Sequence, residues 1–228
     1  NYHRSTSRIY TDYGFLSSDK QIAEDVSNMF MQLTSLGKIP KMHKLLHAPF
    51  TLHDGLLKRV EREMSHAQAG KPAHIIIKVN SLVEPEMIQA FYRASMAGVK
   101  IDLIIRGICC LKPGVKGLSE NIHVRSIIGR FLEHTRVFYF ENDGKSEVWA
   151  GSADMMKRNL LRRVETCFPI ENKKLHQRIV DDLNLYLADN SQAWILSDSG
   201  RYERVERHEG EEVVSAQMTL LSSLAKTY

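Results

Sequence analysis

Cysteine is scarce in this chain of 228 residues, long apolar runs are absent, and neither sign of charge dominates. The cysteines are Cys109, Cys110 and Cys167, a spacing typical of neither a disulfide framework nor a zinc site. We therefore expect free thiols and a reducing, cytoplasmic location. No apolar run approaches the length of a membrane span. The net charge of +4 is mildly basic and does not by itself indicate nucleic-acid binding.

An internal repeat is the most informative pattern that is present. Asp12 lies eleven positions after Asn1, and Glu165 lies eleven positions after Asp154. The two copies are offset by 153 residues, and this offset also pairs Phe15 with Phe168, Lys20 with Lys173, and Val26 with Ile179. His134 precedes the second copy, and its counterpart in the first copy would lie upstream of Asn1. We therefore expect two related half-sites, with the chain beginning inside the first of them.

The hydrophobic periodicity predicts an α/β fold. We expect helices over 19–36, 52–69, 85–97, 173–188 and 211–225. We expect strands over 8–17, 74–79, 100–106, 122–126, 136–141, 147–150 and 164–169, and a hairpin over 193–205. Two prolines and several basic residues in 38–49 favour a linker. The strand–helix–strand order from 74 to 106 predicts parallel strands in a helix-covered sheet.

The residues around the second copy suit phosphate chemistry. An imidazole such as His134 can attack phosphorus or act as acid and base near neutral pH. A carboxylate on its other ring nitrogen would fix its tautomer, and we expect Glu165 to supply it, although Glu165 could instead pair with Arg162 or Arg163. The guanidinium of Arg136 can clamp phosphate oxygens. Gly151-Ser152 at a strand end would let the backbone approach an anion, although such a pair is commonly only a turn.

These residues also carry a family resemblance. His134-x-Arg136, Glu141, Gly151-Ser152-x-Asp154 and Glu165 resemble the His-x-Lys-x4-Asp, Gly-Ser-x-Asn and Glu pattern of the phospholipase D superfamily. Arg136, Glu141 and Asp154 depart from the usual Lys, Asp and Asn, which counts against an ordinary phosphodiesterase. The departures, together with the stretches 1–13, 103–109, 131–137 and 152–159, resemble the bacterial polyphosphate kinases.

The resemblance implies a fold and a domain division. The expected fold is α/β, with a phospholipase D-like mixed sheet flanked by helices. Residues 1–44 would be the end of a first catalytic domain, and 45–228 would be the second.

The resemblance also implies an activity. Polyphosphate kinases transfer the γ-phosphate of ATP reversibly to inorganic polyphosphate with Mg²⁺, through a phosphohistidine. That nucleophile would lie upstream of residue 1, so this fragment alone is expected to be inactive. The metal ligands cannot be assigned from the sequence. The partners implied are ATP, ADP and polyphosphate, with no nucleic acid, in a homo-oligomer (dimer or tetramer) that is cytoplasmic or peripheral to the inner membrane.

Roles for individual residues follow from the same resemblance. His134 matches the second essential histidine, and Asp12 would orient the absent first one. Tyr10 matches a tyrosine at the nucleotide site, although it could simply cap a strand in the core. Arg106 matches an arginine that binds nucleotide phosphate, although it could pair with Asp102 or Glu120. The full set of expected ATP- or phosphate-binding residues is Tyr10, Arg106, His134, Arg136, Ser152, Asp154 and Arg163.

A path for a long polyanion is a further expectation, because basic residues cluster along the chain around the motif. They are Arg125, Arg130, Lys157, Arg158, Arg162 and Arg163. Two other functions stay open on the sequence. One is a phospholipase D-like phosphodiesterase or nuclease, and the other is a non-catalytic module that binds polyanions.

Overall fold

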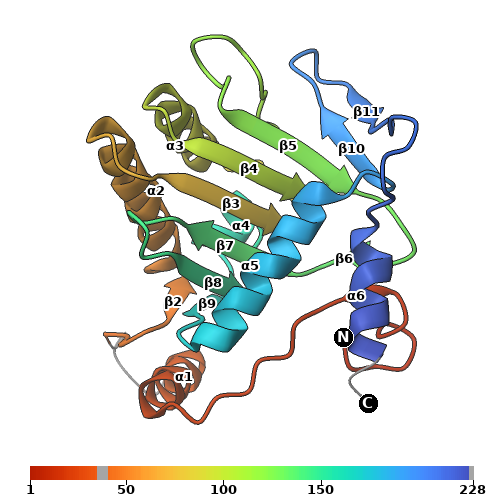
Figure 1. Ribbon diagram of the computed structural model, residues 1–228. Helices are drawn as coiled ribbons and strands as arrows, with labels where there is room; N and C mark the ends of the chain where they lie inside the picture. The colour runs from red at the N-terminus through yellow and green to blue at the C-terminus, as the bar shows by residue number, and fades with distance from the viewer. Residues whose placement is uncertain (35–40, 226–228) are drawn as a thin grey trace.

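The structure is a computed structural model that describes residues 1–34 and 41–225. Its centre is a mixed sheet with the strand order β11-β10-β5-β4-β3-β7-β8-β9-β2 (Figure 1). The strands are β2 (Leu46–Ala48), β3 (His74–Val79), β4 (Lys100–Ile105), β5 (Ile122–Ile127), β7 (Arg136–Phe140), β8 (Glu147–Gly151), β9 (Glu165–Pro169), β10 (Ala193–Leu196) and β11 (Tyr202–Arg204). The helices are α1 (Lys20–Leu33), α2 (Leu52–Gln68), α3 (Pro85–Met96), α4 (Lys157–Leu161), α5 (Lys173–Ala188) and α6 (Ala216–Ala225).

The strand directions explain why the sheet is mixed. β3, β4 and β5 are parallel, with α3 connecting the first two. β7 runs antiparallel to β3, and β8 runs antiparallel to β7. The expected mixed sheet flanked by helices is therefore confirmed, and its parallel part is confined to three strands of the described residues.

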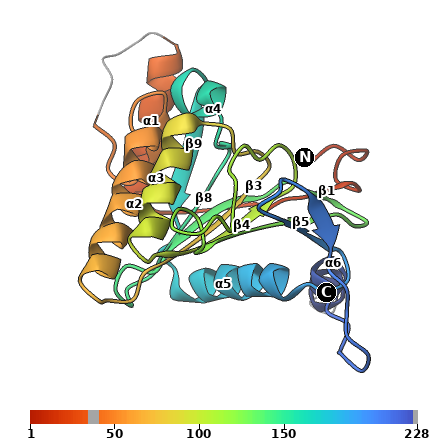
Figure 2. The same ribbon diagram turned by 90° about the horizontal axis from the view of Figure 1, so that it is seen from above.

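The two faces of the sheet bury different helices, because successive side chains of a strand point to opposite sides. Ile75 and Ile77 pack in the cluster that contains α2 and α3 residues, whereas Ile76 packs with residues of α5. Figure 2 shows α2 and α3 on one side of the sheet and α5 on the other. The apolar run in β3 thus reflects burial on both faces.

Local capping sets where the helices begin. The Asp19 carboxylate accepts hydrogen bonds from the backbone N–H groups of Gln21 and Ile22 at the start of α1. Glu84 caps α3, and Pro85 follows it at the first helical position, where its missing N–H costs nothing.

Three segments differ from the sequence expectation. The strand expected over 8–17 is reduced to the two residues of β1 (Tyr10–Thr11). The expected linker contains β2, which pairs with β9 at the edge of the sheet. α6 begins at Ala216 rather than at 211. The last residues of the helix expected over 19–36 and the start of the expected linker lie outside the described residues.

A second, two-stranded sheet brings the N-terminal segment to the middle of the chain. β1 pairs in parallel with β6 (Leu132–Glu133), with Tyr10 opposite Leu132 and Thr11 opposite Glu133. Figure 1 shows this segment beside α6 before the chain continues to α1. Asp12 therefore lies next to His134, although the two are far apart in sequence. Within the described residues, the helices are too short or too polar to span a bilayer.

Candidate functional site

The candidate site forms along one edge of the main sheet, where the carboxyl ends of β3, β4 and β8 and the first residue of β7 lie together. Asn80 and Arg106 follow the carboxyl ends of the parallel strands β3 and β4. Because β7 is antiparallel to β3, its first residue, Arg136, lies at this same edge. Arg136 is paired with Gly151 of β8, which places Asp154 just beyond the end of that strand. Open α/β sheets commonly bind ligands at the carboxyl ends of their parallel strands.

His134 is held on both ring nitrogens. Its Nδ1 lies 2.7 Å from Oδ1 of Asp12, and its Nε2 lies 3.1 Å from Nη1 of Arg136. Since the guanidinium can only donate, these contacts assign a neutral ring with the proton on Nδ1 and the lone pair on Nε2. The Tyr10 ring packs edge-on against the imidazole at a centroid distance of 4.9 Å. The histidine therefore presents a basic nitrogen beside a fixed cation.

The Asp12 carboxylate is stabilised in its charged form. Burial is the largest influence and raises the pKa of Asp12, but hydrogen bonds from Asn1 and His134 together outweigh it and bring the pKa below its usual range. The amide of Asn1 donates to Oδ2 of Asp12 at 2.6 Å. Asp12, which was expected to orient the absent first histidine, therefore holds the histidine of the second copy instead.

A chain of polar contacts links the two arginines. Arg136 donates to both carboxylate oxygens of Asp154 at 3.2 Å, a bidentate ion pair that is largely buried. Asp154 also accepts from the backbone N–H of Asn80 at 2.8 Å. The side-chain oxygen of Asn80 in turn accepts from Nε of Arg106 at 3.2 Å. The structure thus brings Arg106, Arg136 and Asp154 together.

Glu165 does not hold His134, which corrects the expectation from the sequence. Its carboxylate accepts hydrogen bonds from the Ser152 hydroxyl and, at 2.6 Å, from Nδ2 of Asn159. The reason lies in the topology, because Glu165 begins β9 and its strand partner there is Ala48 of β2, whereas Asp12 arrives from the other half of the repeat.

Gly151 is required by the sheet itself. A Cβ at this position would meet the backbone oxygen of Thr166 at 2.4 Å and Cα of Cys167 at 3.0 Å. The Ser152 hydroxyl also accepts from the backbone N–H of Thr166 at 3.2 Å. The Gly-Ser pair therefore serves the close approach of β9 and the fixation of Glu165, in addition to any role toward an anion.

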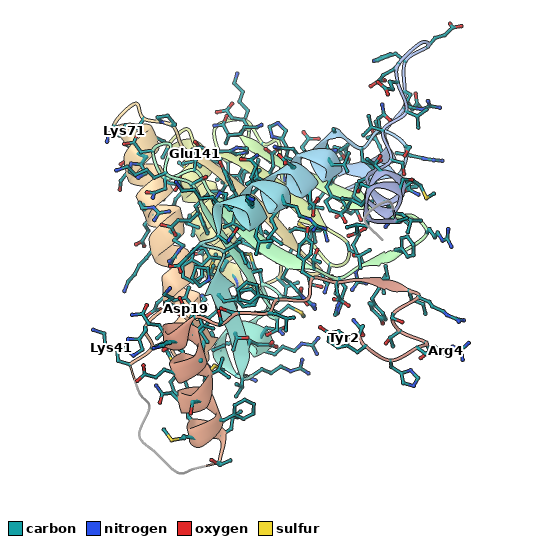
Figure 3. All side chains as sticks on the ribbon, turned by 60° about the horizontal axis from the view of Figure 1, so that its bottom comes forward. Tyr2, Arg4, Asp19, Lys41, Lys71 and Glu141 are labelled. Atoms are coloured by element: carbon teal, nitrogen blue, oxygen red, sulfur yellow. The ribbon has the colours of Figure 1, made fainter. Side chains whose placement is uncertain are left out.

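Glu141 lies away from the site. β7 separates it from Arg136, and its carboxylate accepts a hydrogen bond from the Tyr139 hydroxyl. In Figure 3, Glu141 lies near Lys71, at the opposite end of the molecule from Tyr2 and Arg4 of the N-terminal segment. Glu141 therefore takes no part in the site, although it belongs to the sequence motif.

The basic residues expected to form a polyanion path divide into two groups. Arg125 is half-buried and donates to the backbone oxygens of Tyr186 and Asp189, so its role is structural. The other residues are exposed: Arg130, Lys157, Arg158, Arg162 and Arg163. Arg163 lies in the loop between α4 and β9, where its backbone N–H donates to the oxygen of Arg158.

Two asparagines at the site were not predicted from the sequence. Asn80 directly follows a buried parallel strand, as Arg106 does, and that position was the available signal. Asn159 is buried and its Oδ1 has no hydrogen-bond partner among the described residues. Tyr10 lines a cavity of about 500 Å³ between the N-terminal segment and α5, whereas Arg106 is not among the residues that line it.

Within the part of the chain that the structure describes, no group of three metal-ligating side chains lies at this site. The carboxylates of Asp12, Asp154 and Glu165 are each engaged by His134, Arg136 and Ser152, respectively. Elsewhere in the described residues, His53, Glu84 and Glu86 lie close enough to share an ion. Glu84, however, already caps α3 by accepting from the backbone N–H of Met87 at 2.7 Å. We attribute that cluster to helix capping and ion pairing.

An α/β domain with a polar site at the carboxyl ends of the parallel strands of its mixed sheet is the class that this fold defines. The family model for "Polyphosphate kinase C-terminal domain 2" matches residues 45–217, and that for "C-terminal domain 1" matches residues 1–39. The chain belongs to the polyphosphate kinase family.

Individual relatives agree with this assignment. A polyphosphate kinase of Pseudomonas syringae pv. tomato is 55% identical over 225 residues, which cover 99% of this chain and 31% of the relative. One of Neisseria meningitidis serogroup C is 52% identical and covers 98% of this chain and 33% of the relative. The crystal structure of polyphosphate kinase from Porphyromonas gingivalis superposes with a TM-score of 0.94 at 36% identity, covering 100% of this chain and 35% of that chain. The chain thus spans about a third of the length of these relatives.

Proposed function

We propose that the longer protein to which this chain belongs transfers the γ-phosphate of ATP reversibly to inorganic polyphosphate. The observation that carries the proposal is His134, which is held between Asp12 and Arg136 with its Nε2 lone pair directed at a cation. Phosphoryl transfer asks a protein mainly for positioning and for neutralisation of charge. The linked pair of Arg136 and Arg106 supplies that positive charge at the same edge.

The internal repeat supports a second histidine opposite His134. Asp12 of the first copy holds the histidine of the second, so Glu165, its repeat partner, would hold the histidine of the first. Glu165 is fixed for that role by Ser152 and Asn159. We expect the first histidine to be the nucleophile and to lie upstream of Asn1 in the longer protein.

The proposed reaction has two phosphoryl-transfer steps, and the first histidine takes part in both. Its nitrogen attacks the γ-phosphorus of ATP, a P–N bond forms, the P–O bond to the β-phosphate breaks, and ADP leaves. A terminal oxygen of polyphosphate then attacks the same phosphorus, and the P–N bond breaks. His134 and Arg136 stabilise the transferring phosphoryl group from the opposite half-site. Mg²⁺ would arrive bound to the nucleotide phosphates, because it keeps few protein ligands in such sites.

Further expectations belong to this proposal. Tyr10 stacks or packs against the adenine, and Arg106 binds a nucleotide phosphate. Ser152, Asp154 and Arg163 complete the predicted phosphate-binding set, to which Asp154 contributes by holding Arg136. A reducing, cytoplasmic location also stays a prediction. A homo-oligomer, peripheral contact with the inner membrane and the exclusion of nucleic acid stay predictions.

Incorporation of labelled phosphate tests the proposal. The longer protein is incubated with Mg²⁺ and ATP labelled at the γ-phosphate, and long labelled polyphosphate is measured for wild type, His134→Ala and the control His208→Ala. We expect polymer from wild type and the control but not from His134→Ala. Absence of polymer from wild type would reject the kinase, and hydrolysis of a phosphodiester or binding of polyphosphate without turnover would then decide between the other two functions. This chain by itself is expected to make no polymer.

A further inference from the structure

A buried ion pair lies beneath the site and takes no part in the proposed chemistry. Nζ of Lys78 on β3 lies 2.8 Å from Oε2 of Glu133 on β6, and the two side chains are 3% and 4% exposed. The Tyr186 ring lies 4.8 Å from the same Nζ. Since a buried ion pair seldom stabilises a protein more than apolar side chains of similar volume do, stability alone does not explain this pair.

Both members of the pair have further hydrogen-bond partners, which lie around the site. Glu133 accepts from Nε2 of Gln217 on α6 at 2.7 Å and from the hydroxyl of Thr11 on β1 at 3.0 Å. Lys78 also donates to the hydroxyl of Thr135. The network therefore holds Glu133 and Thr135, which flank His134 in sequence. It also holds Thr11, which lies between Tyr10 and Asp12.

Thr11 connects this network to the histidine. Its hydroxyl accepts from the backbone N–H of His134 at 3.3 Å while it donates to Glu133. By contrast, β1 and β6 have only two residues each, and the Asp12 and His134 side chains are 35% and 27% exposed. So short a ladder and so exposed a contact would fray without support from below.

We propose that Lys78 and Glu133 are positioning residues, which hold the segment carrying Asp12 in register with His134 and thereby align the two half-sites. Only the kinetic consequences of this inference rest on the proposed function.

The charge of the pair supports this arrangement. Burial is the largest influence on Glu133 and raises its pKa, but the adjacent Lys78, Gln217 and Tyr186 together outweigh burial and hold the pKa below its usual range. An ionised Glu133 can accept from Lys78, Thr11 and Gln217 at once, which a protonated carboxyl or an amide cannot do as well.

Thr11 allows a test that leaves the buried charges in place. In the longer protein, Thr11→Val removes the hydroxyl at nearly constant volume, and Thr11→Ser keeps it. We expect Thr11→Val to lower kcat for polyphosphate synthesis by about 10- to 100-fold with a smaller change in KM for ATP, and Thr11→Ser to restore most of the loss. The acid limb of the pH profile should also move to higher pH in Thr11→Val, because Asp12 would lose the hydrogen bond from His134 that lowers its pKa. A Val variant with the kinetics and pH profile of wild type would overturn the inference.

The double variant Lys78→Met/Glu133→Leu tests the pair itself. Apolar replacement should leave the thermal unfolding temperature close to wild type, whereas kcat should fall as it does in Thr11→Val. A double variant that folds and keeps wild-type kcat and pH profile would refute the positioning role. If it does not fold, the Thr11 variants decide.

A spectroscopic measurement separates this inference from the proposed function. The Nδ1–H of His134 is followed by ¹⁵N–¹H spectra of histidine-labelled protein, without substrate. We expect a protected Nδ1–H signal in wild type and Thr11→Ser, and its loss by exchange in Thr11→Val. Persistence of the protected signal in Thr11→Val would contradict the inference even if no polyphosphate is made by any variant.

Discussion

The carboxylate of Asp12 accepts from Nδ1 of His134 and so determines which ring nitrogen carries the proton. Replacing one carboxylate oxygen by an amide nitrogen should therefore change the tautomer. In Asp12→Asn, the amide can donate toward Nδ1, which favours the tautomer with its proton on Nε2, facing Arg136. We expect kcat for polyphosphate synthesis by the longer protein to fall by about 100-fold or more, because a proton on Nε2 would face the Arg136 guanidinium and break the contact by which the two residues stabilise the phosphoryl group. The measurement is labelled-ATP incorporation at neutral pH. Asp12→Glu is the matched control, since it keeps the carboxylate, and equal rates for Asn and wild type would contradict the role.

Glu147 provides a residue-level prediction about stability that does not involve the site. Its carboxylate accepts from Nε of Arg59 and Nε1 of Trp149, both at 3.0 Å, and from Arg62. Burial is the largest influence and raises its pKa, but the bonds and charges of these three partners lower it overall. A depressed pKa means that the stabilisation is present above the ordinary carboxylate value and is lost as the pH falls through the lowered one.

We therefore expect Glu147→Gln to lower the free energy of unfolding by about 1 kcal/mol at pH 7, a value reduced for partial exposure. The difference between wild type and variant should shrink as the pH falls below about 4. Urea unfolding of this chain at several pH values measures it. A difference independent of pH would show that the carboxylate charge is not responsible.

At the level of elements, the sequence predicted those whose signals are local. α5 and β3 have the bounds expected from periodicity, because each combines a long apolar pattern with clear boundary residues. β2 was missed, and β1 was predicted to be longer than it is. Strands of three and two residues exist only through pairing with their partners, β9 and β6. The start of α6 was placed too early for a related reason: Asp189 accepts from the N–H of Ala216 at 2.7 Å, a tertiary contact that fixes the first turn.

The site was predicted only in part, again because local patterns are visible in the sequence whereas tertiary partners are not. Arg136, Asp154 and His134 share one sequence motif and meet as expected. The carboxylate partner of His134 was assigned to Glu165, although Asp12 holds it, because the sequence does not show that the two copies of the repeat interlock. Crossing between halves is a property of β1–β6 pairing, which has no local signature.

The helix α1 leads to a prediction about an interface. α5 buries Ile179, Leu183 and Tyr186 against the sheet, and their repeat partners on α1 are Val26, Phe30 and Leu33. These three are 39%, 64% and 55% exposed. We expect the sheet of the first half to cover this face in the longer protein.

Phe30→Ser should consequently lower the unfolding temperature of the longer protein while leaving that of this chain nearly unchanged. The loss should correspond to about 2–4 kcal/mol if the phenyl ring is buried there. Met31→Ser is the matched control, since its repeat partner Asn184 is exposed on α5. Equal effects of both variants in the longer protein would contradict the expected docking face.

On the scale of the whole molecule, exposed basic side chains are concentrated in the segment that follows Asp154 in the chain. Lys157, Arg158, Arg162 and Arg163 are exposed on α4 and the loop after it, directly beyond Asp154 in the chain. A polyanion that binds there releases counterions, so its affinity should fall steeply with salt. We expect the slope of log affinity against log salt to decrease by about one for each of these charges removed.

Arg158→Ala and Arg162→Ala are therefore predicted to weaken polyphosphate binding to the longer protein and to flatten its salt dependence, singly and additively. Binding is measured by fluorescence anisotropy of end-labelled polyphosphate over a series of salt concentrations. Lys71→Ala is the control, because Lys71 lies at the end of the molecule near Glu141 (Figure 3) and pairs with Asp143 at 2.7 Å. A salt slope that Lys71→Ala lowers as much as Arg158→Ala would mean that net charge, rather than this surface, attracts the polymer.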